Sequence, residues 1–161
     1  MKNLFLLFIT FTLITSCTDK EEEQNSDHIQ SSIALSIQNS NGDDLLNPNN
    51  PNGIDTSKIK IFYVVDGKKT QYFAPANLDN TKGYFIFEHL NEYRIAIFTD
   101  NDDASTKETT FIQWSENDED KIDVLYEKIE SSLFISKVWI NGQDLLYDRF
   151  VNDDPTFTLI K

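Results

Sequence analysis

The fold is decided by residues 58–74, whose sequence is KIKIFYVVDGKKTQYFA. The first eight of these residues are rich in β-branched and aromatic side chains, which favour extended strands. Asp66-Gly67 follows them, and this dipeptide favours the two-residue turn of a β-hairpin because both of its residues tolerate positive φ. Residues 68–74 then run back beside the first strand. The stretch therefore predicts a β-hairpin near the middle of the chain.

The same alternation of strands and turns continues on both sides of this hairpin. Further strands are predicted at residues 32–38, 84–88, 93–98, 109–114, 122–126, 133–140, 145–147 and 156–160, with turn-forming residues between them. About nine strands without a convincing amphipathic helix predict an all-β domain. We expect residues 32–161 to form one antiparallel β-sandwich of immunoglobulin-like or transthyretin-like type, with a small β-barrel as the alternative.

The first residues have the order of a secretory signal peptide. Lys2 supplies a basic start, an apolar run follows, and Thr15-Ser16-Cys17 ends it with small residues and a cysteine. The apolar run covers 11 residues from Leu4 to Ile14, whereas a helix that spans a membrane needs about 20. The pattern therefore favours a cleaved signal over a transmembrane helix; an ordinary signal followed by an incidental cysteine is a further alternative.

Residues 13–17, LITSC, resemble the lipobox of bacterial lipoproteins. The resemblance implies a lipoprotein signal peptide over 1–16, cleavage before Cys17, acylation of Cys17 and anchoring in the outer membrane. Residues 17–31 then form an acidic, flexible tether. Lys20-Glu21-Glu22 resembles the charged export signal of surface-exposed lipoproteins of the Bacteroidetes, which implies exposure on the cell surface; a plain acidic spacer is the alternative.

The part after the tether is similar to small all-β lipoproteins of the Bacteroidetes whose activity is not known. The resemblance rests on residues 44–48 (DLLNP), on 58–61 (KIKI) with 66–69 (DGKK), and on 112–114 (IQW). It implies a sandwich and carries no activity with it.

Charge and cysteine content narrow the class of protein. With 14 basic and 27 acidic residues the formal net charge is −13. We therefore expect no nucleic-acid partner, since binding to a phosphate backbone requires a basic surface. Cys17 is the only cysteine, so no disulfide forms within the chain and a hydrophobic core has to hold the domain.

No pattern of residues selects a catalytic site. Cys17 is assigned to the lipid, and His89 is the only histidine of the predicted sandwich, so a nucleophile with an adjacent base is unsupported. We expect His89 to be a turn residue. The abundance of acidic residues leaves open a small extracellular hydrolase that uses a pair of carboxylates. No cofactor is expected.

Two acidic segments in predicted turns are candidates for a calcium site. Ca²⁺ prefers several carboxylate and carbonyl oxygens, and the segments supply Asp100, Asp102, Asp103, Asp118 and Asp120. Neither segment has the spacing of an EF-hand loop. The alternative is a solvated turn without a metal, which is the usual role of an acidic hairpin tip.

Aromatic residues and one long loop are candidates for binding a ligand. Trp114, Trp139 and Tyr72 have polar neighbours in sequence and could stack on a sugar ring, although packing in the core is the alternative for each of them. The loop around Asn47–Gly53 is rich in Asn and Pro, and long loops are often functional. The sequence thus predicts a non-catalytic binding or structural module with a glycan or protein ligand.

Overall fold

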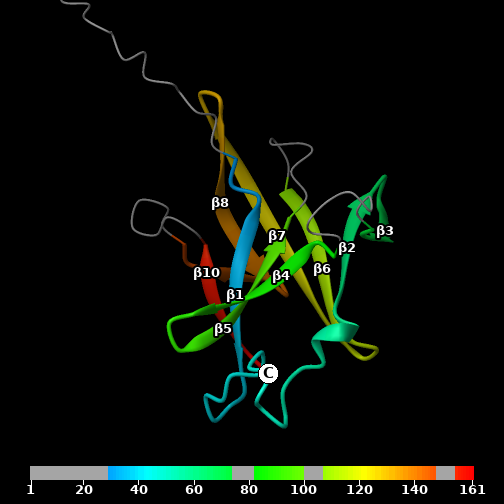
Figure 1. Cartoon of the computed structure of the whole chain (residues 1–161). Helices are drawn as coiled ribbons and strands as arrows, with labels where there is room; N and C mark the ends of the chain where they lie inside the picture. The colour runs from blue at the N-terminus through cyan, green and yellow to red at the C-terminus, as the bar shows by residue number, and fades with distance from the viewer. Residues whose placement is uncertain (1–28, 74–81, 100–106, 148–154) are drawn as a thin grey trace, which may run out of the picture.

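A computed structural model of the chain describes residues 29–73, 82–99, 107–147 and 155–161 (Figure 1). These residues form strands and one short 3-10 turn, η1. The elements are β1 (Ser32–Gln38), η1 (Thr56–Lys58), β2 (Lys60–Val65), β3 (Lys68–Gln71), β4 (Tyr84–His89), β5 (Glu92–Phe98), β6 (Lys107–Ser115), β7 (Asp118–Ile129), β8 (Ser132–Ile140), β9 (Gln143–Leu145) and β10 (Thr156–Ile160). No described helix is long and apolar enough to cross a membrane.

The strands make two sheets that pack face to face, which confirms the predicted all-β sandwich. One sheet has the order β10-β1-β5-β4 and the other has the order β3-β2-β6-β7-β8-β9. They remain two separate sheets, so the barrel alternative is wrong. The predicted hairpins are also confirmed: Val65 pairs with Lys68 across Asp66-Gly67, and Ile140 pairs with Gln143.

The core lies between the two sheets because apolar side chains alternate with polar ones along the strands. Side chains that point inward are almost completely buried, and each contributes about 1.5–3 kcal/mol relative to exposure. They include Ile33, Leu35, Ile37, Ile95 and Ile97 from one sheet and Ile61, Ile112, Ile122, Val124 and Val138 from the other. A hydrogen bond also joins the sheets, since the Tyr63 hydroxyl donates to the Phe98 carbonyl oxygen at 3.0 Å.

One pairing differs from the predicted antiparallel arrangement. β10 lies parallel to β1, with Leu35 opposite Phe157 and Ile37 opposite Leu159. The Ser36 and Thr158 hydroxyls hydrogen-bond at 3.0 Å on the outer side of this pair. Parallel neighbours need a long connection, and here almost the whole domain lies between the two strands.

The ordered sandwich begins before residue 32. Gln30 is buried, its side-chain oxygen accepts a hydrogen bond from the Ile135 backbone N–H at 2.9 Å, and Ile29 forms a bridge to Leu133. Residues 29–31, which the sequence placed in the tether, therefore belong to the domain. An isolated polar residue such as Gln30 gives no periodic signal, so its burial was not predictable.

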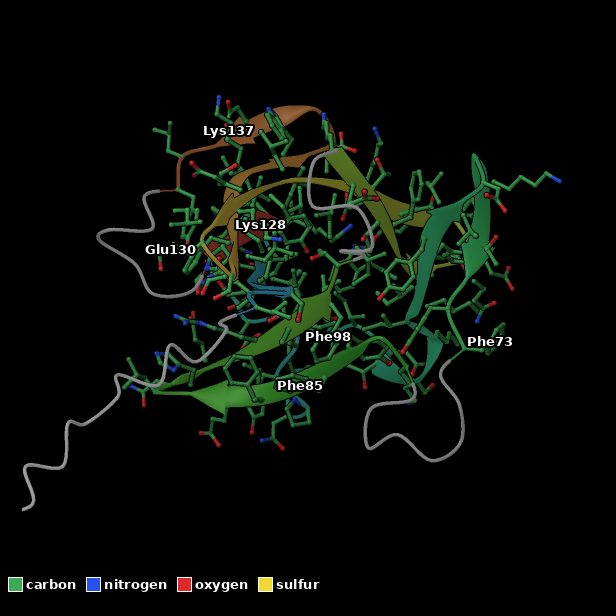
Figure 2. The ribbon with its side chains drawn as sticks, turned by 90° about the horizontal axis from the view of Figure 1, so that it is seen from above. Phe73, Phe85, Phe98, Lys128, Glu130 and Lys137 are labelled. Carbon is green, nitrogen blue, oxygen red and sulfur yellow. The ribbon has the colours of Figure 1, made fainter. Side chains whose placement is uncertain are left out.

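The outer face of the four-stranded sheet carries three phenylalanines. The ring centroid of Phe85 lies 5.6 Å from that of Phe87 and 5.9 Å from that of Phe98. Figure 2 shows Phe85 and Phe98 on the neighbouring strands β4 and β5, well apart from Phe73 beyond β3.

Candidate functional site

The loop after β1 is held in one conformation by its own polar side chains. Several Asn and Asp residues form Asx-turns. In each turn the side-chain oxygen accepts a hydrogen bond from the backbone N–H two residues later. The pairs are Asn39 with Asn41, Asp44 with Leu46, Asn47 with Asn49, Asn50 with Asn52, and Asp55 with Ser57. The Asn-rich sequence is thus a chain of turns, and not a featureless crossover.

Two further contacts fix this loop to the sandwich. Leu45 and Leu46 are buried in the core, and the Leu45 N–H donates to the Ile37 carbonyl oxygen at 2.8 Å. The second carboxylate oxygen of Asp44 accepts the Tyr93 backbone N–H of β5 at 2.7 Å. Asp44 therefore ties the loop to the strand that follows the β4–β5 turn.

Two open hollows adjoin each other around Asp44. The first has a volume of about 410 Å³ and is lined by Gln38, Gly42, Asp44, His89, Leu90, Asn91 and Glu92. The second has a volume of about 420 Å³ and is lined by Asp43, Asp44, Asn47, Asn49, Asn50, Pro51 and Asn52. The pairing of β1 with β5 brings the two parts of the first hollow together. We call the two hollows together the loop-end site.

Leu90, at the rim of the first hollow, is in an unfavourable position on two counts. Its side chain is 83% exposed, and its backbone has φ +56°. For a non-glycine residue the left-handed conformation costs about 1–2 kcal/mol, and Asn or Gly tolerates it far better. The hairpin accounts for this φ, because Leu90 is the first of the two turn residues between the paired His89 and Glu92, and Glu130 has φ +55° at the matching place of the β7–β8 turn. What folding leaves unexplained is an exposed apolar side chain at the rim of the hollow.

The polar groups of the loop-end site suit a ligand with hydroxyl groups. The side chains of Gln38, Asn49, Asn52 and Asn91 have no partner among the described residues, whereas both Asp44 oxygens are used by backbone N–H groups. A carboxamide offers two donors and an acceptor. The site can thus bind hydroxyl groups through amides while Leu90 contacts an apolar patch. No pattern in the sequence singled out Gln38, Leu90 or Asn91.

Trp114 is a core residue in this structure. It is 2% exposed and its indole N–H donates to Asp120 at 2.6 Å. Asp120 also accepts the Asn141 side-chain N–H at 2.7 Å and pairs with the Lys161 ammonium at 2.9 Å. Because β7 and β10 belong to different sheets, this network joins them. A buried ring has no open face for a sugar, so core packing is the role that the structure gives Trp114.

Burial and hydrogen bonds have opposite effects on the pKa of Asp120. Burial alone would raise its pKa, but hydrogen bonds from Asn141, Lys161 and Trp114 outweigh burial, and the pKa of Asp120 is lowered from 3.8. Asp118 contacts Lys161 as well, at 2.6 Å. Both aspartates lie in strand β7, not in the predicted turn, because Asp118 pairs with Ser115 and Asp120 pairs with Ile112 of β6. A glycosidase needs a carboxylic acid with a raised pKa, which Asp120 does not supply.

Trp139 lies on the outer face of the six-stranded sheet. A bulge at Ser136 shifts the alternation of β8, so that Ile135 and Val138 both point inward and Trp139 points outward. Strict alternation along β8 would place Trp139 and Ile135 on one face, and the bulge places them on opposite faces. The Lys107 ammonium lies 4.3 Å from the centroid of the Trp139 ring. Lys137, on the same strand, lies on the side of β8 away from β4 and β5 (Figure 2).

Asp123, opposite Trp139, is buried on this outer face by its partners. It is 3% exposed, pairs with Lys107 at 3.0 Å and Lys121 at 2.9 Å, and accepts the Thr109 hydroxyl at 2.7 Å. Burial raises its pKa, but the hydrogen bonds from Thr109, Lys121 and Lys107 more than compensate, and the pKa is lowered. The cations around Trp139 are thus already engaged, and the face is filled by its own contacts.

The remaining candidates fall in different places. Tyr72 packs against Tyr63, with ring centroids 5.1 Å apart, and lines the core. Asp100, Asp102, Asp103 and Cys17 lie outside the described residues. Within the described ranges, no group of three or more His, Cys, Asp or Glu side chains could hold a metal ion. The calcium site stays a prediction.

No protein-family model, no curated protein and no solved structure matches this chain. Its function therefore has to be inferred from its own side chains.

Proposed function

We propose that this protein is a lipid-anchored, non-catalytic binding module of the bacterial outer membrane, and that it binds a glycan at the loop-end site. The observation that carries the proposal is Leu90, an apolar side chain exposed at the rim of a hollow lined by amides. Ligand sites are typically concave, with apolar contacts and a few placed polar groups. A sugar ring matches this combination, since it has an apolar face and a rim of hydroxyl groups.

The position of the site supports the proposal. Ile29, the first described residue, lies beside Leu133 near the β7–β8 turn, whereas Gln38 at the other end of β1 lines the first hollow. Seven strand residues separate the two ends, which corresponds to about 23 Å. In Figure 1 the chain enters β1 at the top, and the cyan loop lies at the bottom. A tether before Ile29 thus leaves the loop-end site turned away from the membrane.

Replacing Asn91 or Asn49 with Ala should weaken glycan binding about fivefold, because each change removes a hydrogen bond worth about 1 kcal/mol. The full chain is screened against an oligosaccharide panel, and the affinity of each positive sugar is measured by calorimetry. Asn117→Ala is the matched control, since Asn117 is an exposed turn residue outside both hollows.

Other outcomes of this screen would overturn the proposal. Binding that survives the Asn49 and Asn91 changes but fails with Trp139→Ala would move the site to the outer face of the six-stranded sheet. Release of shortened sugars that stops when one acidic residue is replaced would identify a hydrolase. If no oligosaccharide of the panel binds, the proposal that the ligand is a glycan is wrong.

The anchor is tested separately by Cys17→Ala in cells. We expect unprocessed precursor or released soluble protein, because the acyl chains that hold the domain on the membrane are attached to this residue. Membrane and soluble fractions are compared by immunoblot, and protease shaving of intact cells reports whether the domain faces outward. A Cys17→Ala protein that is processed and still fractionates with membranes would show that the anchor is elsewhere.

A further inference from the structure

We infer that the loop-end site selects uncharged glycans and rejects those that carry carboxylate, sulfate or phosphate groups. This inference rests on the proposed function and specifies its ligand class. The two hollows are lined by three acidic side chains, Asp43, Asp44 and Glu92, and no lysine or arginine is among the described residues that line them. These negative charges would therefore repel a sugar that carries a negative charge.

Arg94, the nearby cation, does not make the charge of the loop-end site positive. Arg94 donates from Nε to Glu92 at 2.6 Å and so offsets one of the three acidic groups. The other two are held by neutral donors: Asp43 accepts the Asn39 side-chain N–H at 2.8 Å, and Asp44 accepts two backbone N–H groups. These hydrogen bonds stabilise the carboxylates without cancelling their charge. The site keeps two negative charges, within a chain whose formal net charge is −13.

The described cations are concentrated elsewhere in the molecule. The outer face of the six-stranded sheet carries several lysines, which pair with its acids or lie on its aromatic rings. Lys69 contacts Glu119 and the rings of Phe62 and Phe111, and Lys107 and Lys121 hold Asp123. Among the three acidic side chains of the loop-end site, Asp43 and Asp44 have no such partner among the described cations. Repulsion between exposed charges acts over about 8–10 Å at moderate ionic strength, which is enough to cover both hollows.

The test compares neutral oligosaccharides with uronate-bearing oligosaccharides of matched length on the full chain. At low salt we expect the uronate-bearing sugars to bind about tenfold more weakly, and the difference to shrink as salt is added. Asp43→Asn should raise the ratio of uronate to neutral affinity several-fold, because it removes one charge while retaining the shape of the side chain.

Glu130→Gln is the charge-matched control. Glu130 lies in the β7–β8 turn, which is at the opposite end of the sandwich from the cyan loop in Figure 1, so the affinity ratio should not change. If Glu130→Gln raises the ratio of uronate to neutral affinity as much as Asp43→Asn does, the effect comes from the overall charge of the protein. The inference that the loop-end site itself selects uncharged glycans would then be wrong. Equal binding of both sugar classes would overturn the selectivity while leaving the proposed function intact. If neither class binds, the proposed function fails first.

Discussion

Asp120→Ala should lower the free energy of unfolding by about 3 kcal/mol, because removing one partner of a buried ion pair leaves the other groups without compensation. Asp120 is 6% exposed and accepts hydrogen bonds from Trp114, Asn141 and Lys161. Its loss leaves an indole N–H and an amide N–H without their acceptor in a buried position. It also removes one of the two contacts that Lys161 makes with β7, and leaves only the contact with the more exposed Asp118. Chemical denaturation should show a lower midpoint with an unchanged slope.

The effect of this substitution should depend on pH. The pKa of Asp120 is lowered from 3.8 in the folded protein, so its contribution to stability is present above pH 3.8. It is lost as the pH falls through the folded pKa, where the carboxylate becomes protonated in the native state. The difference in unfolding free energy between the native sequence and Asp120→Ala should therefore be full at neutral pH and shrink in acid.

Asp118→Ala is the control for this prediction. Asp118 contacts the same lysine, but its side chain is 45% exposed, and exposed ion pairs contribute only about 0–1 kcal/mol. A cost for Asp118→Ala as large as that for Asp120→Ala would contradict the argument from burial. So would a difference between the native sequence and Asp120→Ala that does not change with pH.

Leu90→Asn should stabilise the fold and weaken ligand binding at the same time. Asn tolerates the left-handed backbone found at this position, φ +56°, so we expect a gain of about 1 kcal/mol in unfolding free energy. For a domain of this size the melting temperature should rise by about 3 °C. Loss of the apolar contact should weaken binding of the glycan about tenfold. Thermal unfolding and calorimetry measure the two effects on the same preparation.

Two further variants separate the backbone from the side chain. Leu90→Ala removes the apolar contact but keeps the strained backbone, so it should weaken binding without raising the melting temperature. Leu146 is 98% exposed and is not among the positive-φ residues, so Leu146→Asn should change neither quantity. If Leu90→Asn binds as well as the native sequence, Leu90 is not part of the site.

The strands could be predicted from the sequence because alternation with a period of two is a local property. Each predicted strand is present, and the ends differ where a distant residue intervenes. β7 begins at Asp118 rather than near Ile122 because its first residues pair with the end of β6. Lys161, more than 40 residues away, also contacts Asp118 and Asp120. The outward position of Trp139 depends on the bulge at Ser136, whose hydroxyl bonds to the Leu125 carbonyl oxygen. Local patterns carry neither kind of information.

The candidate site was only partly predictable, for a related reason. The Asn-Pro segment around Asn47–Gly53 could be identified as a long loop from its composition. Its hollows, however, require the β4–β5 turn, and only the pairing of β1 with β5 brings that turn alongside. The strain at Leu90 is a backbone property of a residue type that gives no turn signal.

The parallel contact between β1 and β10 has a mechanical consequence. With an anchor before Ile29 and a ligand at Gln38, a pulling force would run along β1, which is hydrogen-bonded to β10 on one side and to β5 on the other. Pulling along a strand loads its lateral hydrogen bonds all together in shear, whereas pulling across a strand opens them one after another. Forced unfolding is governed by the barrier along the pulling direction. With the proposed anchor and ligand, a polymer that pulls on the domain would load the hydrogen bonds of β1 in shear.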